Sequence, residues 1–142
     1  MNAREYPDYP MVGVGVVVFN EHDQILLVRR GNEPSRGLWA LPGGIVELGE
    51  ELKSAAAREV MEECAIEVAI EDVADVIDLI LKDENEEVKY HYILIDYYAK
   101  YAGGQLSPQS DVSDARWFSK ADIQELDMPE VTQKVISKAF AR

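Results

Sequence analysis

The stretch from residue 43 to residue 66 constrains the fold of this chain more than any other. A Gly-rich turn is followed there by an Ala-rich segment of good helix propensity, which predicts a helix over residues 51–65. Residues three and four apart on a helix are neighbours, so Glu59, Glu62 and Glu63 would share one face with their Cβ atoms about 5–6 Å apart. Like charges at this spacing repel each other unless a cation lies between them. Converging carboxylate oxygens suit Mg²⁺ or Mn²⁺.

A second face of the same helix indicates how it is anchored. Ala56, Val60 and Cys64 repeat every four residues and form a narrow apolar stripe beside the acidic face. Small side chains there let the helix pack close to a sheet, and this packing would fix the direction of the carboxylates. Arg58 adjoins Glu59 and can hold that carboxylate, or the Gly-rich loop, in a set orientation.

These residues resemble the signature of the Nudix hydrolases. The signature reads Gly, five residues, Glu, seven residues, Arg-Glu, an aliphatic residue, any residue, Glu-Glu, any residue, Gly and an aliphatic residue. All of the specified positions but one match, namely Gly44, Glu50, Arg58, Glu59, Val60, Glu62, Glu63 and Ile66. The exception is Ala65, where the family has a glycine that ends the helix in a tight turn, so the alanine bears on the helix terminus and not on the acidic face. Residues 38–43 resemble the lead-in to this signature.

The order of the remaining elements predicts a mixed β-sheet between helices in one domain over residues 1–142, with residues 1–10 as a loose N-terminal arm. The resemblance implies the same α/β class, an α/β/α sandwich in which the signature forms a loop–helix–loop motif. Hydrophobic patterns predict strands at residues 11–19, 24–30, 39–41, 45–47, 66–82 (as one or two strands), 88–101 and 115–118. Apolar residues on both faces of 88–101 indicate a strand that is covered by helices on both sides, or by one layer of helices and a ligand. A short helix over residues 120–126 and a final helix opening at Pro129 complete the chain.

The resemblance implies hydrolysis of a nucleoside diphosphate linked to another group, with Mg²⁺ as cofactor and Mn²⁺ as a substitute. Glu59, Glu62 and Glu63 would hold the metal, and a backbone carbonyl of Gly43 or Gly44 would complete its shell. The general base is Glu59, Glu50 or an acid from elsewhere in the chain. Asp111 and Asp114 precede Trp117 in a region where relatives often supply a carboxylate, and Asp111 is the stronger candidate of the two.

Four further residues are candidates for substrate binding. Arg29, Arg30 and Arg36 flank the loop of residues 31–37, where they would either contact phosphates or lie in solvent at a strand end. Trp39 would either stack on a nucleobase or pack in the core, and the same two alternatives hold for Tyr90, Tyr92, Tyr97 and Tyr98.

Charge and composition limit the partners. A net charge of −13 argues against nucleic-acid polymers and anionic membranes, and it requires cations at any site that binds phosphates. Cys64 is the only cysteine, so no internal disulfide can form, and its place on the apolar stripe predicts a buried structural thiol. The N-terminus lacks the order of a signal peptide and the longest apolar run is too short to span a bilayer, so we expect a cytoplasmic protein. Many family members are dimers, which makes a homodimer a further expectation.

Three functions follow from the resemblance. The small size and compact lead-in favour a MutT-like enzyme that removes pyrophosphate from nucleoside triphosphates, including oxidised ones. An ADP-ribose or other nucleotide-sugar pyrophosphatase is the alternative, although no proline occurs between Pro42 and Pro108, where ADP-ribose enzymes often carry one. A non-catalytic nucleotide-binding regulator usually lacks one of the helix glutamates, and here all are present.

Overall fold

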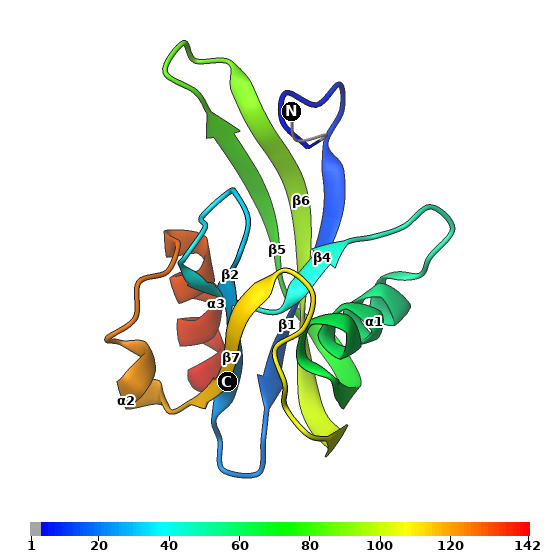
Figure 1. The fold of residues 1–142 in the computed structure, drawn as a ribbon, viewed down its shortest axis with the longest axis vertical. Helices are drawn as coiled ribbons and strands as arrows, with labels where there is room; N and C mark the ends of the chain where they lie inside the picture. Colours follow the sequence, from blue (N-terminus) through cyan, green and yellow to red (C-terminus); the bar gives the residue numbers. More distant parts are fainter. Residues whose placement is uncertain (1–3) are drawn as a thin grey trace.

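A computed structural model describes residues 4–142 of the chain as a mixed β-sheet with helices on both faces (Figure 1). The α/β/α class predicted from the sequence is confirmed. The elements in chain order are β1 (Met11–Phe19), β2 (Ile25–Arg30), β3 (Trp39–Ala40), β4 (Gly43–Ile45), α1 (Leu52–Cys64), β5 (Ile66–Lys82), β6 (Val88–Gly104), β7 (Val112–Phe118), α2 (Lys120–Ile123) and α3 (Glu130–Phe140).

Strand β1 lies at the centre of the sheet and divides its pairing between two neighbours on one edge. On the other edge it runs parallel to β6 along its whole length, from Met11 opposite Tyr92 to Phe19 opposite Lys100. On the divided edge, β4 pairs with residues 13–15 of β1, whereas β2 pairs only at its end, with Phe19 opposite Ile25. Strands β3 and β7 extend the sheet from β2. The sheet therefore splits between β4 and β2.

The core has two apolar clusters, one on each face of the sheet. Side chains alternate between faces along a strand, so Val16 and Val17 of β1 are both fully buried but belong to different clusters. Tyr97 and Tyr98 of β6 divide in the same way, the first toward α1 and the second toward α3. At these residues the strand is therefore covered on both sides by helices, the first of the two predicted arrangements.

Helix α1 begins and ends within one residue of the predicted bounds, and its apolar stripe is buried. Ala56, Val60 and Cys64 have no exposed surface, and burial raises the pKa of the Cys64 thiol to about 12, which fits a structural cysteine. Ala65 ends the helix in the left-handed region, at φ 62° and ψ 24°, and its N–H donates to the Met61 carbonyl. The alanine thus adopts the conformation that glycine adopts most readily.

The strand predicted at residues 45–47 lies two residues earlier, at Gly43–Ile45, because Gly43 and Gly44 belong to β4 and not to a turn. A Cβ on Gly43 would overlap the Val14 carbonyl oxygen of β1, so only glycine allows this close pairing. Strand β6 likewise continues through Gly103 and Gly104, where the pattern predicted a break, and these residues pair with the start of β5. Helix α2 ends at Ile123, earlier than expected.

The N-terminal arm is tied to the hairpin of β5 and β6 over its described residues 4–10. The Tyr6 N–H donates to the Lys89 carbonyl at 2.8 Å, and the Tyr6 hydroxyl donates to Asp83 at 2.9 Å. The Tyr90 hydroxyl donates to Glu5 at 3.1 Å. The arm is therefore held in this part and not loose; the start of the predicted arm, residues 1–3, lies outside the described residues.

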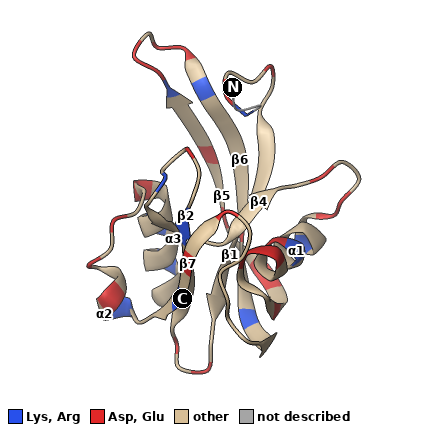
Figure 2. Ribbon diagram, viewed as in Figure 1, with Lys and Arg blue, Asp and Glu red and all other residues tan. Residues whose placement is uncertain are grey.

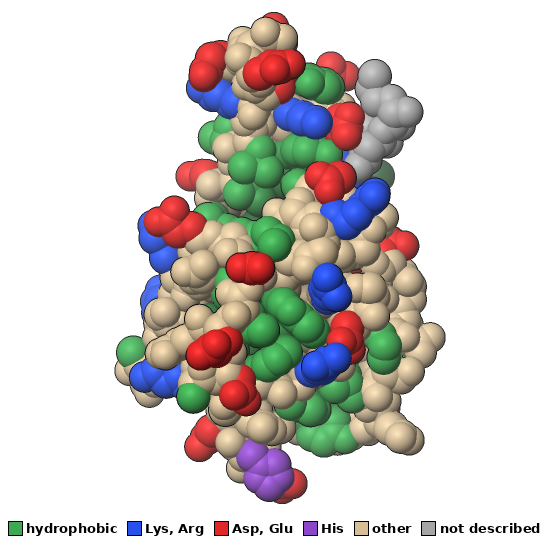
Figure 3. Space-filling view, turned by 60° about the vertical axis from the view of Figure 1, so that its left-hand side comes forward, with side chains coloured by type: hydrophobic (Ala, Val, Ile, Leu, Met, Phe, Trp, Pro, Cys, Tyr) green, Lys and Arg blue, Asp and Glu red, His purple; other side chains and the backbone are tan. Residues whose placement is uncertain are grey.

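Below its charged tip, the same hairpin exposes apolar side chains (Figure 3). Within residues 4–142, no helix is long and apolar enough to cross a membrane.

Candidate active site

A cavity of about 400 Å³ opens at the split in the sheet, within the range typical of small-molecule sites. Glycines of the split, Gly15 in β1 and Gly43 and Gly44 in β4, line it. At one end lie acidic residues of α1, and at the other lie Val131 and Val135 of α3. Figure 2 shows acidic positions on α1 and on the loop that leads into β7. The cavity thus connects the two faces of the sheet.

Arg58 holds the acidic face of α1 in place. Its Nη1 donates to Glu59 at 2.8 Å and to Glu62 at 3.2 Å. Its Nε and Nη2 donate to both oxygens of Glu50, at 2.6 and 2.9 Å, and Nη2 also donates to the Ile45 carbonyl. Arg58 therefore contacts both Glu59 and the loop before α1, which were the two alternatives expected for it.

Glu50 belongs to this clamp and does not line the cavity. Its Oε1 also accepts the N–H of Glu47 at 3.0 Å, which closes the loop before α1. The hydrogen bonds from Arg58 lower the pKa of Glu50 to about 2. Glu50 therefore acts as a fixed anion that positions Arg58.

Glu63 is the most deeply buried of the three helix glutamates. Its Oε1 accepts the N–H of Gly43 at 2.9 Å. Burial raises the pKa of Glu63 to about 7, and burial also raises the pKa of Glu59. Burial thus disfavours the charged forms of two neighbouring carboxyls. A cation bound between them would stabilise these charged forms.

The backbone of β4 presents a further oxygen toward α1. The hydrogen bonds from the Val16 N–H to the Pro42 carbonyl and from the Val46 N–H to the Val12 carbonyl set the alternation of the ladder. In an antiparallel pair, every second residue directs its N–H and carbonyl toward the partner strand. Gly44 therefore directs these groups toward β1, whereas the N–H and carbonyl of Gly43 point away from β1. The contact between the Gly43 N–H and Glu63 agrees with this direction.

The carboxylates share the cavity but do not converge on one point. Among residues 4–142, no group of three His, Cys, Asp or Glu side chains is arranged to hold a metal ion. Arg58 holds Glu59 and Glu62, and Gly43 holds one oxygen of Glu63. The donor set nevertheless suits a hard divalent cation, since it consists of carboxylates and a backbone carbonyl.

Asp111 is brought to the cavity by the loop that precedes β7. The N–H groups of Ser107 and Gln109 donate to the carbonyls of Cys64 and Glu63 at 3.0 and 2.8 Å, which docks the loop on the C-terminal end of α1. Asp111 lines the cavity. Asp114 does not, because it pairs with Arg116 at 2.8 Å and accepts the N–H of Ala115.

The four predicted substrate-binding residues separate in the structure. Arg30 lines the cavity, with its Nε donating to the Pro34 carbonyl at 2.6 Å. Arg29 and Arg36 are not among the cavity residues, and Arg29 donates to the Gly37 carbonyl at 3.1 Å. Trp39 packs edge-to-face on Phe118 with ring centroids 5.0 Å apart, in the core and outside the cavity.

Strand β6 supplies two further polar cavity residues. Asp96 was missed by the sequence analysis, whereas Tyr92 was expected either to stack on a nucleobase or to pack in the core. Asp96 and Tyr92 both line the cavity and are 5% exposed. The available signal was an acidic residue in the middle of the longest apolar strand, where a buried charge needs a reason.

The chain matches the NUDIX domain family over residues 9–139. It is 30% identical over 118 residues to an ADP-ribose pyrophosphatase of Methanocaldococcus jannaschii, an alignment covering 83% of this chain and 67% of the relative.

Solved structures with the same fold include the MutT protein of Methanosarcina mazei, with a TM-score of 0.77, 27% identity and 96% of each chain covered. They also include the NUDIX domain of Shewanella oneidensis NrtR in complex with ADP ribose, with a TM-score of 0.78, 25% identity, and 96% and 90% of the two chains covered. The chain therefore belongs to the Nudix hydrolase family, enzymes that act on the pyrophosphate bonds of nucleotides.

Proposed function

We propose that the chain is a Mg²⁺-dependent pyrophosphohydrolase of the MutT type, acting on nucleoside triphosphates with normal or oxidised bases. The observation that carries this proposal is the cavity itself, which joins the acidic face of α1 to an apolar pocket beside α3. A nucleotide has the same two parts, a charged phosphate chain and a flat, largely apolar base.

Each cavity residue near α1 has a role in this proposal. Glu59, Glu62 and Glu63 hold the cation, with Asp111 and the Gly43 carbonyl as further oxygen donors. When bound, Mg²⁺ neutralises the diphosphate and lowers the pKa of a coordinated water. Arg58 positions two of the carboxylates, and it must give up part of its present hydrogen bonding to them when the cation binds.

Arg30 contacts a phosphate. Among the two named candidates for the general base, Glu59 lines the cavity and Glu50 does not, so Glu59 is the base of this proposal.

A second candidate is hydrolysis of ADP-ribose. It is favoured by the relative from M. jannaschii, which is an ADP-ribose pyrophosphatase, and by the NrtR domain, which was solved with ADP ribose. The reaction at the phosphates would be the same, so the two candidates differ only in what fills the rest of the cavity.

The test is hydrolysis of dGTP, 8-oxo-dGTP, dATP and ADP-ribose, each with Mg²⁺ and with EDTA. We expect release of pyrophosphate from a triphosphate, only with the metal present. Release of AMP from ADP-ribose as the dominant activity would establish the second candidate. Nucleotide binding without turnover of any substrate would make the chain a regulator.

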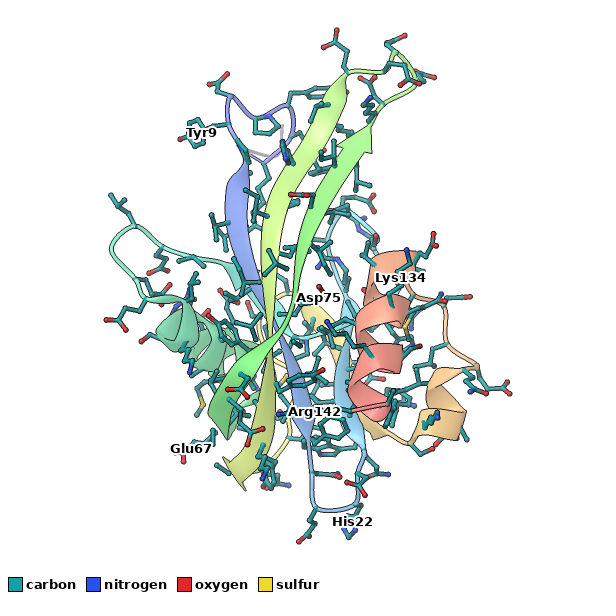
Figure 4. All side chains as sticks on the ribbon, turned by 180° about the vertical axis from the view of Figure 1, so that it is seen from behind. Tyr9, His22, Glu67, Asp75, Lys134 and Arg142 are labelled. Atoms are coloured by element: carbon teal, nitrogen blue, oxygen red, sulfur yellow. The ribbon has the colours of Figure 1, made fainter. Side chains whose placement is uncertain are left out.

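A matched pair of variants tests the role of the helix glutamates. Glu63→Gln should abolish turnover while leaving the fold intact, because it removes the buried charge that faces the cation. Glu67→Gln is the control, since Glu67 is exposed at the start of β5, away from the cavity (Figure 4). Equal activity in both variants would overturn the metal assignment.

A further inference from the structure

Asp96 is the only buried charged side chain within residues 4–142 and has no compensating partner there. It is 5% exposed, lies near the middle of β6 and lines the cavity. No hydrogen bond or ion pair joins it to any described residue. Buried carboxyls in folded proteins nearly always have such partners, so this one calls for an explanation.

Two features of its surroundings disfavour the charged form of Asp96. Burial raises the pKa of its carboxyl to about 7, and the carboxylate of Asp75 adds to the effect. Asp75 lies directly opposite on β5, and Figure 4 shows it on the same side of the sheet as α3. Like charges directly opposite each other on neighbouring strands are unfavourable.

The backbone beside Asp96 leaves space for this carboxylate. Gly15 of β1 is the register partner of Asp96, and a Cβ on Gly15 would overlap the Asp96 Oδ1. The same Cβ would lie 3.6 Å from Leu41. Glycine at this position therefore lets the carboxylate lie over β1, beside the split through which the cavity passes.

Around Asp96 the cavity is mostly apolar. The hydroxyl of Tyr92, four residues earlier on the same face of β6, is buried and has no partner among the described residues. The other cavity-lining side chains of β5, β6 and α3 are apolar except for Thr132, namely Ile77, Leu79, Leu81, Leu94, Val131, Thr132 and Val135. Apolar walls with one or two polar groups are the usual surroundings of a bound ring system, in which the polar groups select the ligand.

We propose that Asp96 is a specificity-determining residue that recognises a guanine-type base. The inference rests on the proposed nucleotide substrate. Above its raised pKa the Asp96 carboxylate is ionised and is only an acceptor, with two oxygens side by side. The guanine edge offers two adjacent donors, the ring N1–H and the 2-amino group, which match it. The 8-oxo form of guanine keeps both donors.

Other bases fit this carboxylate less well. Adenine places a ring nitrogen acceptor beside its amino group, so one carboxylate oxygen would face a lone pair. A site built to satisfy a buried polar group rejects ligands that leave it unpaired. Asp96 therefore favours guanine nucleotides over adenine nucleotides, ADP-ribose included.

The test compares Asp96→Asn with the wild type in two assays at pH 8.5, where the Asp96 carboxyl is ionised. The first assay measures the ratio of kcat/KM for dGTP to kcat/KM for dATP. In Asp96→Asn this ratio should fall by about 10- to 100-fold, because hydrogen bonds to a charged group contribute a free energy of that size. The second is calorimetric binding of dGMP and dAMP in EDTA, which depends on neither turnover nor metal. The wild type should bind dGMP more tightly, and the variant should lose this preference. Asp78→Asn, at an exposed position of β5, is the matched control.

Two outcomes separate this inference from the proposed function. If the wild type hydrolyses nucleotides but Asp96→Asn leaves both the dGTP:dATP ratio and the dGMP preference unchanged, the role of Asp96 is overturned and the function stands. If the wild type hydrolyses none of the nucleotides but binds dGMP in an Asp96-dependent way, the role of Asp96 stands and the function is overturned. If the wild type neither binds dGMP nor hydrolyses any nucleotide, both the role of Asp96 and the proposed function are overturned.

Discussion

Replacing Gly44 by alanine should inactivate the enzyme without unfolding it. A Cβ on Gly44 would lie 2.5 Å from the Cδ and Oε2 of Glu59 and 2.6 Å from its Oε1. Ordinary contacts of this kind begin at 3.4 Å, so the carboxylate must move by 3.4 − 2.5 = 0.9 Å. The backbone of Gly44 is not in the left-handed region and accepts alanine. The atoms that must move are the end of a flexible side chain, so the cost in stability is small.

The functional cost is larger, because Glu59 is a proposed metal ligand and base. A misplacement of about 1 Å at a reacting group lowers the rate by about 100-fold, or about 2.7 kcal/mol of barrier. The move also disturbs the hydrogen bond that the Arg58 Nη1 donates to Glu59 at 2.8 Å. We expect kcat/KM for the best nucleotide to fall by about 100-fold and the thermal midpoint to change by only a few degrees.

Steady-state kinetics with Mg²⁺ and a thermal melt measure the two effects. Gly37→Ala is the matched control. A Cβ on Gly37 would meet no atom within 4 Å, so it displaces no side chain, although the residue has a φ of +82° that strains an alanine. It should lose about 1 kcal/mol of stability through backbone strain and keep its activity. Retention of activity within about threefold by Gly44→Ala, when an effect of about 100-fold is expected, would refute the reasoning.

Three further predictions concern stability and are read from thermal melts. Ala65→Gly should stabilise the protein by about 1 kcal/mol, because glycine adopts the left-handed conformation of this helix end without strain, and a lower midpoint would show that the alanine is not strained. Tyr92→Phe should stabilise it by about 1 kcal/mol, because the hydroxyl is buried without a partner in the described chain, and destabilisation would reveal a partner. Asp96→Asn should raise the midpoint relative to the wild type more at pH 7 than at pH 4. The sign follows because the folded pKa of Asp96 is raised to about 7 from 3.8, so the native state holds a proton that the unfolded chain releases between these pH values; a difference independent of pH would contradict the burial of this carboxyl.

The helix at the centre of the site was predictable because its information is local. Spacing alone placed the three glutamates on one face and Ala56, Val60 and Cys64 on another. The resemblance predicted that the helix ends at residue 65. An alanine by itself does not indicate a helix end.

The sheet was harder to predict where distant residues meet. Gly43 and Gly44 look like a turn in the sequence, and their place inside β4 follows only from the close approach of β1. Alternation along β2 sends Arg30 into the cavity and Arg29 away from it, but which of the two points inward depends on the neighbouring strands. Asp96 stands out in the sequence as an acidic residue in an apolar strand, but its lack of a partner becomes visible only when its neighbours on β1 and β5 are known. The predicted homodimer stays a prediction.

The location of a divalent cation tests the account most directly. A crystal grown with Mn²⁺ and a non-hydrolysable dGTP analogue gives the metal position from its anomalous scattering. We predict Mn²⁺ bound by at least two of Glu59, Glu62 and Glu63, with the hydrogen bonds of Arg58 to Glu59 and Glu62 rearranged. Mn²⁺ bound elsewhere, with the three glutamates still held by Arg58 and Gly43, would contradict the account.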